Sequence, residues 1–235
     1  MLILGLDSSA AAGSCALCEV SGDSVKLVAE SFINTKQTHS QTLMPMTENM
    51  LKSVGIGFDK LDRVAVTSGP GSFTGVRIGV SAAKGLGYAL GIPCIGVSAL
   101  HAVASGFAGF NGIICAVMDA RRSQFYNALF SVRGGKPERI TPDRAISAED
   151  LEKELLKFND KVFFAGDGAE LASKLITNVE AELAPPYLRF PKASCVCFSS
   201  QEYEAVTAAR LMPVYLRLPQ AERERLAREK EHSGK

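Results

Sequence analysis

The 235-residue sequence lacks several features that would place it in a functional class at once. With 26 Lys and Arg against 25 Asp and Glu, it lacks the broad basic field of a protein that binds nucleic acid unaided. No apolar run approaches the length of a membrane-spanning helix. The apolar start has no basic leader and is interrupted by Asp7, which predicts a strand rather than a secretory signal. These absences favour a cytoplasmic protein that does not act at a membrane.

Metal-binding and nucleophilic residues are also scarce. The three histidines are His39, His101 and His232, and none has a histidine or carboxylate at a convincing ligand spacing. The sequence contains no Cys–His pair and no G-x-S-x-G elbow that would support hydrolysis. We therefore predict no metal site and no catalytic residue.

The six cysteines are interpreted as reduced thiols. Cys15 and Cys18 lie in a predicted strand, where residues three apart point to opposite faces and chelate one metal poorly. Cys195 and Cys197 are likewise interpreted as buried or half-buried thiols of a cytosolic protein. Whether any of them has a redox role stays open.

Strand and helix patterns fill the first part of the chain. Short apolar strands over residues 2–6, 14–20 and 26–32 predict an antiparallel meander. The helix that follows contains Pro45, which predicts either a kink or a late helix start. A strand at residues 63–67, a helix at about 74–90, a strand in GIPCIGVS and a helix in ALHAVASGFAG complete this unit.

Near residue 111 the pattern restarts. GIICAVMDARRSQFYNALFSV reads as strand, polar turn and strand, like MLILGLDSSAAAGSCALCEV, and helix, strand and helix follow. A last helix is predicted in SSQEYEAVTAARL. The sequence therefore predicts tandem α/β lobes of βββαβα type, residues 1–108 and 109–217, and a charged, flexible tail, residues 218–235. This plan resembles the two-lobed actin-like ATPase superfamily (the ASKHA, ribonuclease H-like fold), which holds a nucleotide between its lobes.

Each predicted lobe has an aspartate where its first strand ends. Asp7 is followed by Ser8 and Ser9, and Asp119 is followed after one residue by Arg121. An aspartate at such a turn can hold a metal–phosphate through water while hydroxyl and N–H groups face the anion. It can equally bond its own backbone. Both interpretations stay open, and Arg121 or the arginine after it would supply the positive charge that a phosphate site needs.

The stretch SGPGSFTGVRIG, residues 68–79, is rich in glycine directly after a predicted strand. Gly69 precedes Pro70, and the pair Pro70 and Gly71 fits the centre of a type II turn. Ser72 or Thr74 can cap the following helix, whose first N–H groups form an anion site in principle. The stretch is not a Walker loop, because the lysine–serine pair is missing.

The helix after this stretch has small residues four apart along one face. Each interior glycine costs on the order of 1 kcal/mol against alanine, a cost that close approach of another helix offsets. Packing within the chain explains part of this small-residue stripe, and a partner's helices would explain the rest, together with the methionine-rich helix before it. The predicted docking residues are His39, Leu43, Met46, Met50, Gly75, Gly79, Ala83 and Gly87.

Six segments together resemble one family over nearly the whole chain. They are GLDSS, HSQTLMP, SGPGSFTGVRIG, GIPCIGVSAL, DARRSQFY and PVYLR, and they look like bacterial TsaB. The resemblance implies a cytoplasmic, actin-like protein that pairs through its N-lobe helices with its catalytic paralogue TsaD and works with the ATPase TsaE. TsaD transfers a threonylcarbamoyl group from threonylcarbamoyl-AMP to the adenosine beside the anticodon of certain tRNAs.

The resemblance also implies that the chain is a non-catalytic platform. TsaD binds its metal through H-x-x-x-H, and Ala99 and Val103 stand at those two positions here, with His101 between them. Gln124 stands where a TsaB chain is expected to have glutamate. The platform would form a homodimer when alone, contact tRNA only within the complex and hold no tight cofactor, with ATP or ADP and Mg²⁺ bound at most at the TsaD interface.

One alternative from another functional class stays open. A stand-alone ATPase or phosphotransferase of the actin-like fold would need a catalytic base and a complete adenosine pocket. AGDGAEL, residues 165–171, is the candidate for such a pocket, and it could equally be an ordinary turn from strand to helix.

Overall fold

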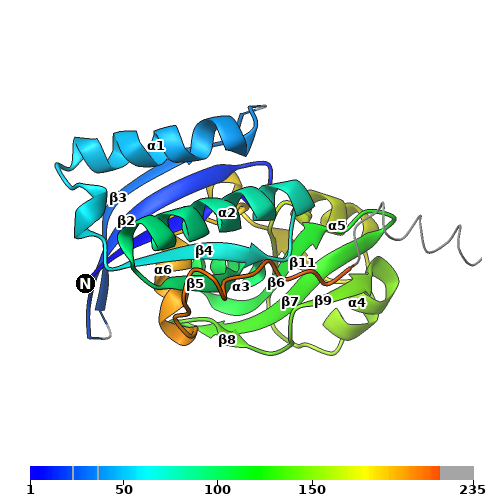
Figure 1. Ribbon diagram of the computed structural model, residues 1–235. Helices are drawn as coiled ribbons and strands as arrows, with labels where there is room; N and C mark the ends of the chain where they lie inside the picture. The colour runs from blue at the N-terminus through cyan, green and yellow to red at the C-terminus, as the bar shows by residue number, and fades with distance from the viewer. Residues whose placement is uncertain (23, 36, 218–235) are drawn as a thin grey trace, which may run out of the picture.

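The computed structural model describes residues 1–22, 24–35 and 37–217, and its strands form two sheets (Figure 1). The predicted charged tail lies outside these residues. In the first sheet the strand order is β3-β2-β1-β4-β5. Its strands are β1 (Leu2–Asp7), β2 (Gly13–Ser21), β3 (Ser24–Ile33), β4 (Arg63–Gly69) and β5 (Cys94–Ser98). β1 pairs antiparallel with β2 and parallel with β4, and β2 pairs antiparallel with β3, which confirms the meander.

The second sheet repeats this arrangement. Its order is β11-β10-β6-β7-β8, and β9 also pairs with β7. The strands are β6 (Asn111–Asp119), β7 (Gln124–Arg133), β8 (Glu138–Arg139), β9 (Arg144–Ser147), β10 (Val162–Ala165) and β11 (Ala181–Leu183). β6 pairs antiparallel with β7 and parallel with β10, as β1 pairs with β2 and β4. The predicted repeat of the lobe topology is therefore confirmed, while the predicted lobe bounds, with their boundary at residue 108 just before β6, stay a prediction.

Helices cover both sheets in layers. They are α1 (His39–Ser53), α2 (Phe73–Leu90), α3 (Ala99–Ser105), α4 (Ala148–Leu155), α5 (Ala169–Leu175) and α6 (Ala193–Ser199), with short 3₁₀ turns η1 (Phe58–Lys60), η2 (Pro186–Leu188) and η3 (Ser200–Glu202). α1 and α2 pack on the outer face of the first sheet, and α4 and α5 pack on the outer face of the second. α3 and α6 lie side by side on the inner face of the first sheet, where α3 also contacts β6 and β7.

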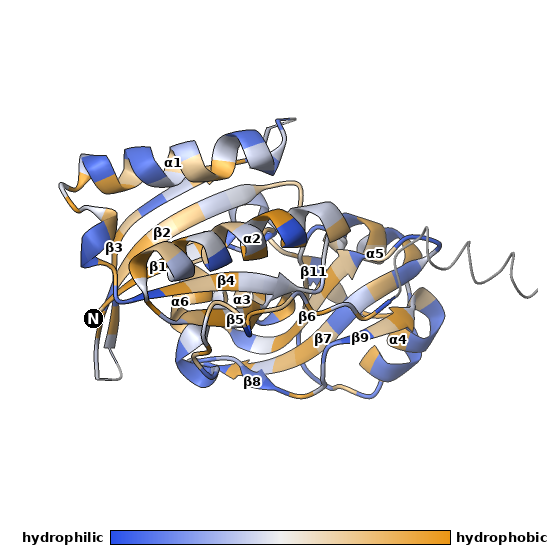
Figure 2. Cartoon of the chain, viewed as in Figure 1, coloured by the Kyte–Doolittle hydropathy of each residue, from blue (hydrophilic) through white to orange (hydrophobic). Residues whose placement is uncertain are grey.

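Apolar burial follows these layers. Figure 2 shows hydrophobic residues concentrated on the strands, while α1 and α4 carry many hydrophilic residues. On α3, Leu100 and Val103 pack toward the second sheet, and Ala102 packs toward the first. No helix in the described ranges has the length and apolar character needed to cross a membrane.

The end of the described chain corrects one predicted element. The helix predicted in SSQEYEAVTAARL is wrong, because only η3 is helical there and residues 203–217 run as an irregular segment, which we call the strap. Its backbone bonds to the first sheet at two points: Val206 forms a β-bridge with Cys94, and the Val214 N–H donates to the Ser68 carbonyl. The last helix of the described residues is α6, which precedes the predicted one.

Two smaller predictions concern α1 and the cysteines. α1 begins at His39 with Pro45 inside it, so a helix start after the proline is wrong. All six cysteines are buried and free, as predicted. Cys15 and Cys18 lie in clusters on opposite faces of β2, and burial raises the pKa of the Cys15 thiol to about 11.

Candidate binding cleft between the lobes

The turn between β1 and β2 is sealed from solvent. Asp7, Ser8 and Ser9 each have 0% exposure. Asp7 Oδ1 accepts hydrogen bonds from Ser9 N (3.2 Å), Ser9 Oγ (2.7 Å) and Thr67 Oγ1 on β4 (2.7 Å), whereas Oδ2 has no partner among the described residues. Burial raises the pKa of Asp7, and the bonds from Thr67 and Ser9 oppose that shift. Asp7 thus bonds its own turn, the second of the two interpretations left open by the sequence.

The glycine-rich stretch packs directly on this turn. Ser72 N donates to the Ser9 carbonyl (2.7 Å), and Ser8 Oγ donates to the Gly75 carbonyl (2.8 Å). A Cβ at Gly71 would overlap the Ser9 carbonyl oxygen, and a Cβ at Gly75 would overlap that of Ser8. The glycines are therefore needed because two segments of the same chain come into backbone contact.

The detailed shape of the stretch departs from one prediction. Gly71 has a φ of 154°, whereas a type II turn requires about +80° at that position, so the predicted type II turn is wrong. The Gly69–Pro70 peptide bond is cis. Ser72 caps α2, because its Oγ accepts from Gly75 N at 3.2 Å, and this prediction is confirmed.

The small-residue stripe of α2 faces the interior of its own lobe. Gly75, Gly79, Ala83 and Gly87 are all buried. A Cβ at Gly79 would lie 2.5 Å from Ser8 Oγ and 3.3 Å from a methyl group of β4, and one at Gly87 would lie 2.5 Å from a thiol of β5. The prediction that this stripe docks a partner is therefore wrong, because the atoms that approach it belong to the same chain.

Two of the four docking residues predicted on α1 are buried as well. Leu43 is 1% exposed and Met50 is 4% exposed, and both belong to the core under α1 and α2, so their prediction as partner contacts is wrong too. Met46 is half-buried. His39 is also half-buried, with Nε2 2.8 Å from the Ala10 carbonyl oxygen.

A different flank of α2 stays open beside α1. Ile78 and Ala82 are half-buried, Gly85 and Ala89 are exposed, and these four positions follow helical spacing along one flank. A Cβ at Gly85 would meet no atom of the described residues within 4 Å. We call these residues, with Met46 of α1, the α1–α2 face.

The turn between β6 and β7 differs from its counterpart in the first lobe. The Asp119 side chain is 33% exposed, and its Oδ1 accepts from Arg121 N at 2.7 Å. Arg121, Arg122 and Ser123 have φ values of 67°, 56° and 53°, so three consecutive residues adopt the left-handed conformation. The Arg121 guanidinium lies 3.5 Å from the Asp119 carboxylate and is 86% exposed.

A cleft of about 820 Å³ lies between the two lobes. Four of the predicted anion-site residues line it, Gly71, Ser72, Asp119 and Arg121, together with His39 and Gly75 from the predicted docking set. Asp7, Ser8, Ser9 and Gly69 do not line it, because the glycine-rich stretch and the strap cover them. Lining residues that sequence reasoning did not single out include Tyr126, Asp167, Phe190, Tyr215 and Arg217.

Asp167 is a cleft residue that the sequence could have identified. It lies in AGDGAEL, directly after β10, at the edge of the sheet where parallel strands end. The pKa of its carboxyl is raised to about 6, chiefly by desolvation and also by the charges of Asp119 and Asp7, although backbone hydrogen bonds oppose the shift. The cleft thus combines carboxyl groups with Arg121 and Arg217, a combination suited to binding a polar ligand. Its described lining contains no lysine or cysteine.

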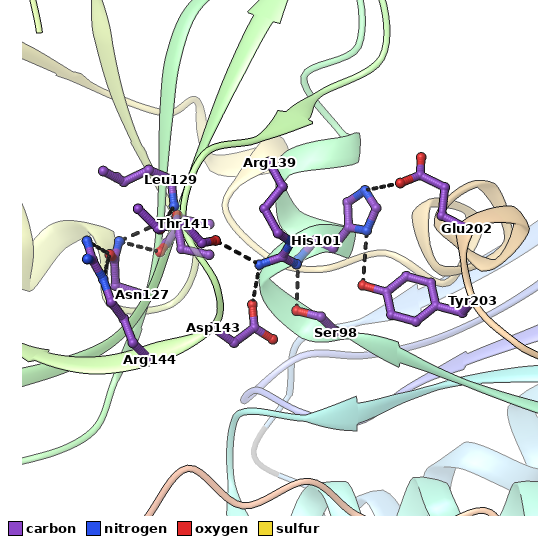
Figure 3. Close-up of polar contacts among 12 residues, drawn as sticks. Ser98, His101, Asn127, Leu129, Arg139, Thr141, Asp143, Arg144, Glu202 and Tyr203 are labelled. Carbon is purple, nitrogen blue, oxygen red and sulfur yellow. Dashed lines mark hydrogen bonds and ion pairs between the residues drawn. The ribbon is translucent and has the colours of Figure 1, made fainter.

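The positions corresponding to the TsaD metal ligands lie inside the molecule. Ala99 and Val103 are 0% and 1% exposed. His101 has Nδ1 3.1 Å from the Tyr203 hydroxyl and Nε2 3.8 Å from Glu202, as Figure 3 shows. Burial lowers the pKa of His101, against the opposing charge of Glu202. Among the residues that the structure describes, no three His, Cys, Asp or Glu are grouped to hold a metal ion.

Comparisons with known proteins find a family model described as TsaD and curated relatives named TsaB. The family model described as "TsaD: tRNA N6-adenosine threonylcarbamoyltransferase" matches residues 26–226. The chain is 35% identical over 200 residues to the tRNA threonylcarbamoyladenosine biosynthesis protein TsaB of Bacillus subtilis (strain 168), covering 83% of this chain and 87% of that protein. It is 30% identical over 233 residues to TsaB of Haemophilus influenzae, covering 92% and 94%. The solved structure of YeaZ from Pseudomonas aeruginosa is similar, with a TM-score of 0.76, 26% identity and coverage of 92% and 99%.

Proposed function

Because this chain belongs to the TsaB family, we propose that it serves tRNA threonylcarbamoyladenosine biosynthesis as a non-catalytic subunit that binds a TsaD protein. In this proposal TsaD transfers the threonylcarbamoyl group from threonylcarbamoyl-AMP to the adenosine beside the anticodon. This chain supports TsaD as a platform, and the ATPase TsaE works with the two proteins. Without TsaD, the chain pairs with a second copy of itself.

The observation that carries the proposal is the α1–α2 face. Its small and apolar side chains are half-buried or exposed, although the same helices bury the faces that pack on the first sheet. The open space at Gly85 allows a partner's helix to approach closely. Such a face suits a docking surface built from helices.

The non-catalytic part of the proposal rests on the residues of α3. Ala99 and Val103 offer a methyl and an isopropyl group where TsaD has metal ligands, and neither group can bind a metal. His101 between them is held by Tyr203 and Glu202. The alternative, a stand-alone ATPase or phosphotransferase, would need Asp7 to face the nucleotide, and Asp7 is sealed beneath the glycine-rich stretch.

A nucleotide with Mg²⁺ remains part of the proposal at the TsaD interface. Arg121 and Arg217 in the cleft would face phosphate, and Asp119 and Asp167 would hold the hydrated metal. Ile78 lines the cleft and also belongs to the α1–α2 face, so a docked partner would border the cleft mouth. ATP or ADP is therefore expected to bind the complex more tightly than the free chain, and equal calorimetric affinities would contradict this.

Gly85→Leu tests the docking face with little risk to the fold. The leucine enters open space in the free chain, but it occupies the place of the partner's backbone in the complex. Binding to TsaD from the same organism, measured by sedimentation velocity, should weaken by about tenfold or more. Gly135→Leu, at a second glycine with open space but in the other lobe, is the matched control and should bind normally. Normal binding by Gly85→Leu would remove the α1–α2 face from the proposal, and failure of the unchanged chain to bind would overturn the proposed function.

A further inference from the structure

Two segments that contain α2 and most of the strap have no acidic residue. Residues 63–118 and 205–217 include no Asp or Glu but five Lys and Arg, whereas the rest of the chain has 21 Lys and Arg against 25 Asp and Glu. The two segments lie side by side, because the strap runs antiparallel along α2 (Figure 1). The near-zero net charge therefore conceals a locally basic surface.

The cations of this surface are held by neutral groups instead of carboxylates. Lys84 Nζ donates to the Ala209 and Leu211 carbonyls of the strap at 3.2 and 3.0 Å. Arg77 Nε donates to the Tyr215 hydroxyl at 2.8 Å, and its guanidinium carbon lies 3.9 Å from the centre of the Phe73 ring. Within the described ranges, neither cation forms an ion pair. Their positive charge is therefore available to an external anion.

Exposed aromatic and apolar side chains are interleaved with these cations. Tyr88 is 64% exposed and lies one helical turn beyond Lys84 on the same flank of α2. On the strap, Met212 is 63% exposed and Tyr215 is 40% exposed, and Arg210 is exposed beside them. We call the following set the α2–strap face: Arg77, Lys84, Tyr88, Arg210, Met212 and Tyr215.

We infer that the α2–strap face binds tRNA, through its phosphates and at least one unstacked base. The inference rests on the proposed function, which places tRNA at the complex. Unpaired cations attract phosphates, and exposed tyrosines beside arginine provide surfaces on which unpaired RNA bases stack. An acidic protein segment would be attracted by the same charges, but it has no need of exposed aromatic planes. The combination of both features favours RNA.

The α2–strap face leaves room for the proposed TsaD partner. Arg77, Lys84 and Tyr88 follow one flank of α2, whereas Ile78, Ala82 and Gly85 follow the flank toward α1. One helix therefore offers separate flanks to a protein and to RNA. A surface this small binds tRNA weakly when alone, which agrees with the absence of a broad basic field. Its contribution should be measured mainly in the complex.

The test uses Arg210→Glu, because this exposed side chain forms no hydrogen bond or ion pair within the described structure and its replacement should leave the fold intact. An unmodified tRNA transcript is titrated by fluorescence anisotropy against the complex with TsaD, and against the chain alone, at several salt concentrations. We expect binding by the complex to weaken by about tenfold and the slope of log K against log salt to fall by more than about 1. Tyr88→Ala should weaken binding by about fivefold to a hundredfold with the salt slope unchanged.

Lys174→Glu on α5 is the matched control, since it reverses an exposed charge of the second lobe that has no ion pair among the described residues. It should bind tRNA like the unchanged chain. The inference is overturned if Arg210→Glu and Tyr88→Ala both bind tRNA normally. It is also overturned if they weaken binding to TsaD instead, which would make the face a protein contact. Sedimentation of the protein mixture before RNA is added detects failure of the proposed function separately, and the titration of the chain alone then still tests the face.

Discussion

The two lobes begin with the same motif, a strand ending in aspartate followed by a tight turn, but the two turns have opposite environments. Asp7 is 0% exposed and bonds to Ser9 and Thr67. The Asp119 side chain is 33% exposed and lines the cleft beside Arg121. The first turn therefore stabilises the fold, and the second supplies polar groups to the cleft.

The difference comes from the loop that packs on each turn. In the first lobe, the glycine-rich stretch and the start of α2 cover Ser8 and Ser9. In the second lobe, the loop after β10 packs on the end of β6 itself: a Cβ at Gly166 would overlap the Val117 carbonyl oxygen, and one at Gly168 would lie 3.0 Å from Asp119 N. Because that loop packs on the end of β6 and does not cover the turn, the side chains of Asp119 and Arg121 remain accessible from the cleft. A repeated sequence motif thus does not guarantee a repeated role.

The largest effect on stability is expected from Gly75→Ala. Its methyl group would overlap the Ser8 carbonyl oxygen, and this backbone contact cannot shift without separating α2 from the first turn. We expect a loss of about 3 kcal/mol in the free energy of unfolding, measured by urea denaturation. Gly85→Ala, on the open flank of the same helix, should instead gain up to about 1 kcal/mol. Equal stability of the two variants would contradict the assigned orientation of α2.

Removing each aspartate in turn should give unequal losses. Asp7→Ala leaves the buried donors of Ser9 and Thr67 without their acceptor, which should cost about 2 kcal/mol. Asp119→Ala removes a partly exposed carboxylate at a surface turn and should change stability by no more than about 0.5 kcal/mol. Urea denaturation of both variants at neutral pH measures the difference. Similar losses in the free energy of unfolding would show that both turns serve mainly to stabilise the fold.

The smallest expected effect is on pH dependence in the cleft. The pKa of Asp167 is raised to about 6 from an ordinary value near 4, so its contribution to stability is full below about pH 4 and is lost as pH rises through about 6. Asp119→Asn removes a neighbouring negative charge and should lower the pKa of Asp167, measured by NMR titration of the carboxyl group. An unchanged pKa would contradict the placement of these two carboxyls in one cleft.

Most secondary structure could be predicted because the hydrophobic periodicity and the positions of turn-forming and helix-capping residues agree along most of the chain. Ser147, for example, stands three residues before Asp150 and caps α4, since its Oγ accepts from Asp150 N at 3.0 Å. The end of the chain was not predictable in this way. Local helical spacing in SSQEYEAVTAARL competes with tertiary bonds to the first sheet, such as that between Val206 and Cys94, and the tertiary bonds prevail.

The docking surface shows a second limit of sequence reasoning. Glycines four apart indicate that a backbone comes close to α2, but periodicity does not say whose backbone it is. The structure places Gly75 and Gly79 against the first turn and leaves Gly85, the α2 glycine outside the stripe, in open space. The cleft was predicted in part, because Asp119 and Arg121 line it, while Tyr215 and Arg217 reach it only through the unforeseen course of the strap.

Reconstitution of tRNA modification from purified proteins tests the central claim most directly. TsaD and TsaE from the same organism are incubated with threonylcarbamoyl-AMP and unmodified tRNA, with and without this chain, and the modified nucleoside is quantified by mass spectrometry. We expect rapid product formation only when this chain is present, no product from the chain alone, and a strong loss with Gly85→Leu but not with Gly135→Leu. Full activity without the chain, or product from the chain alone, would contradict its assignment as a required, non-catalytic platform.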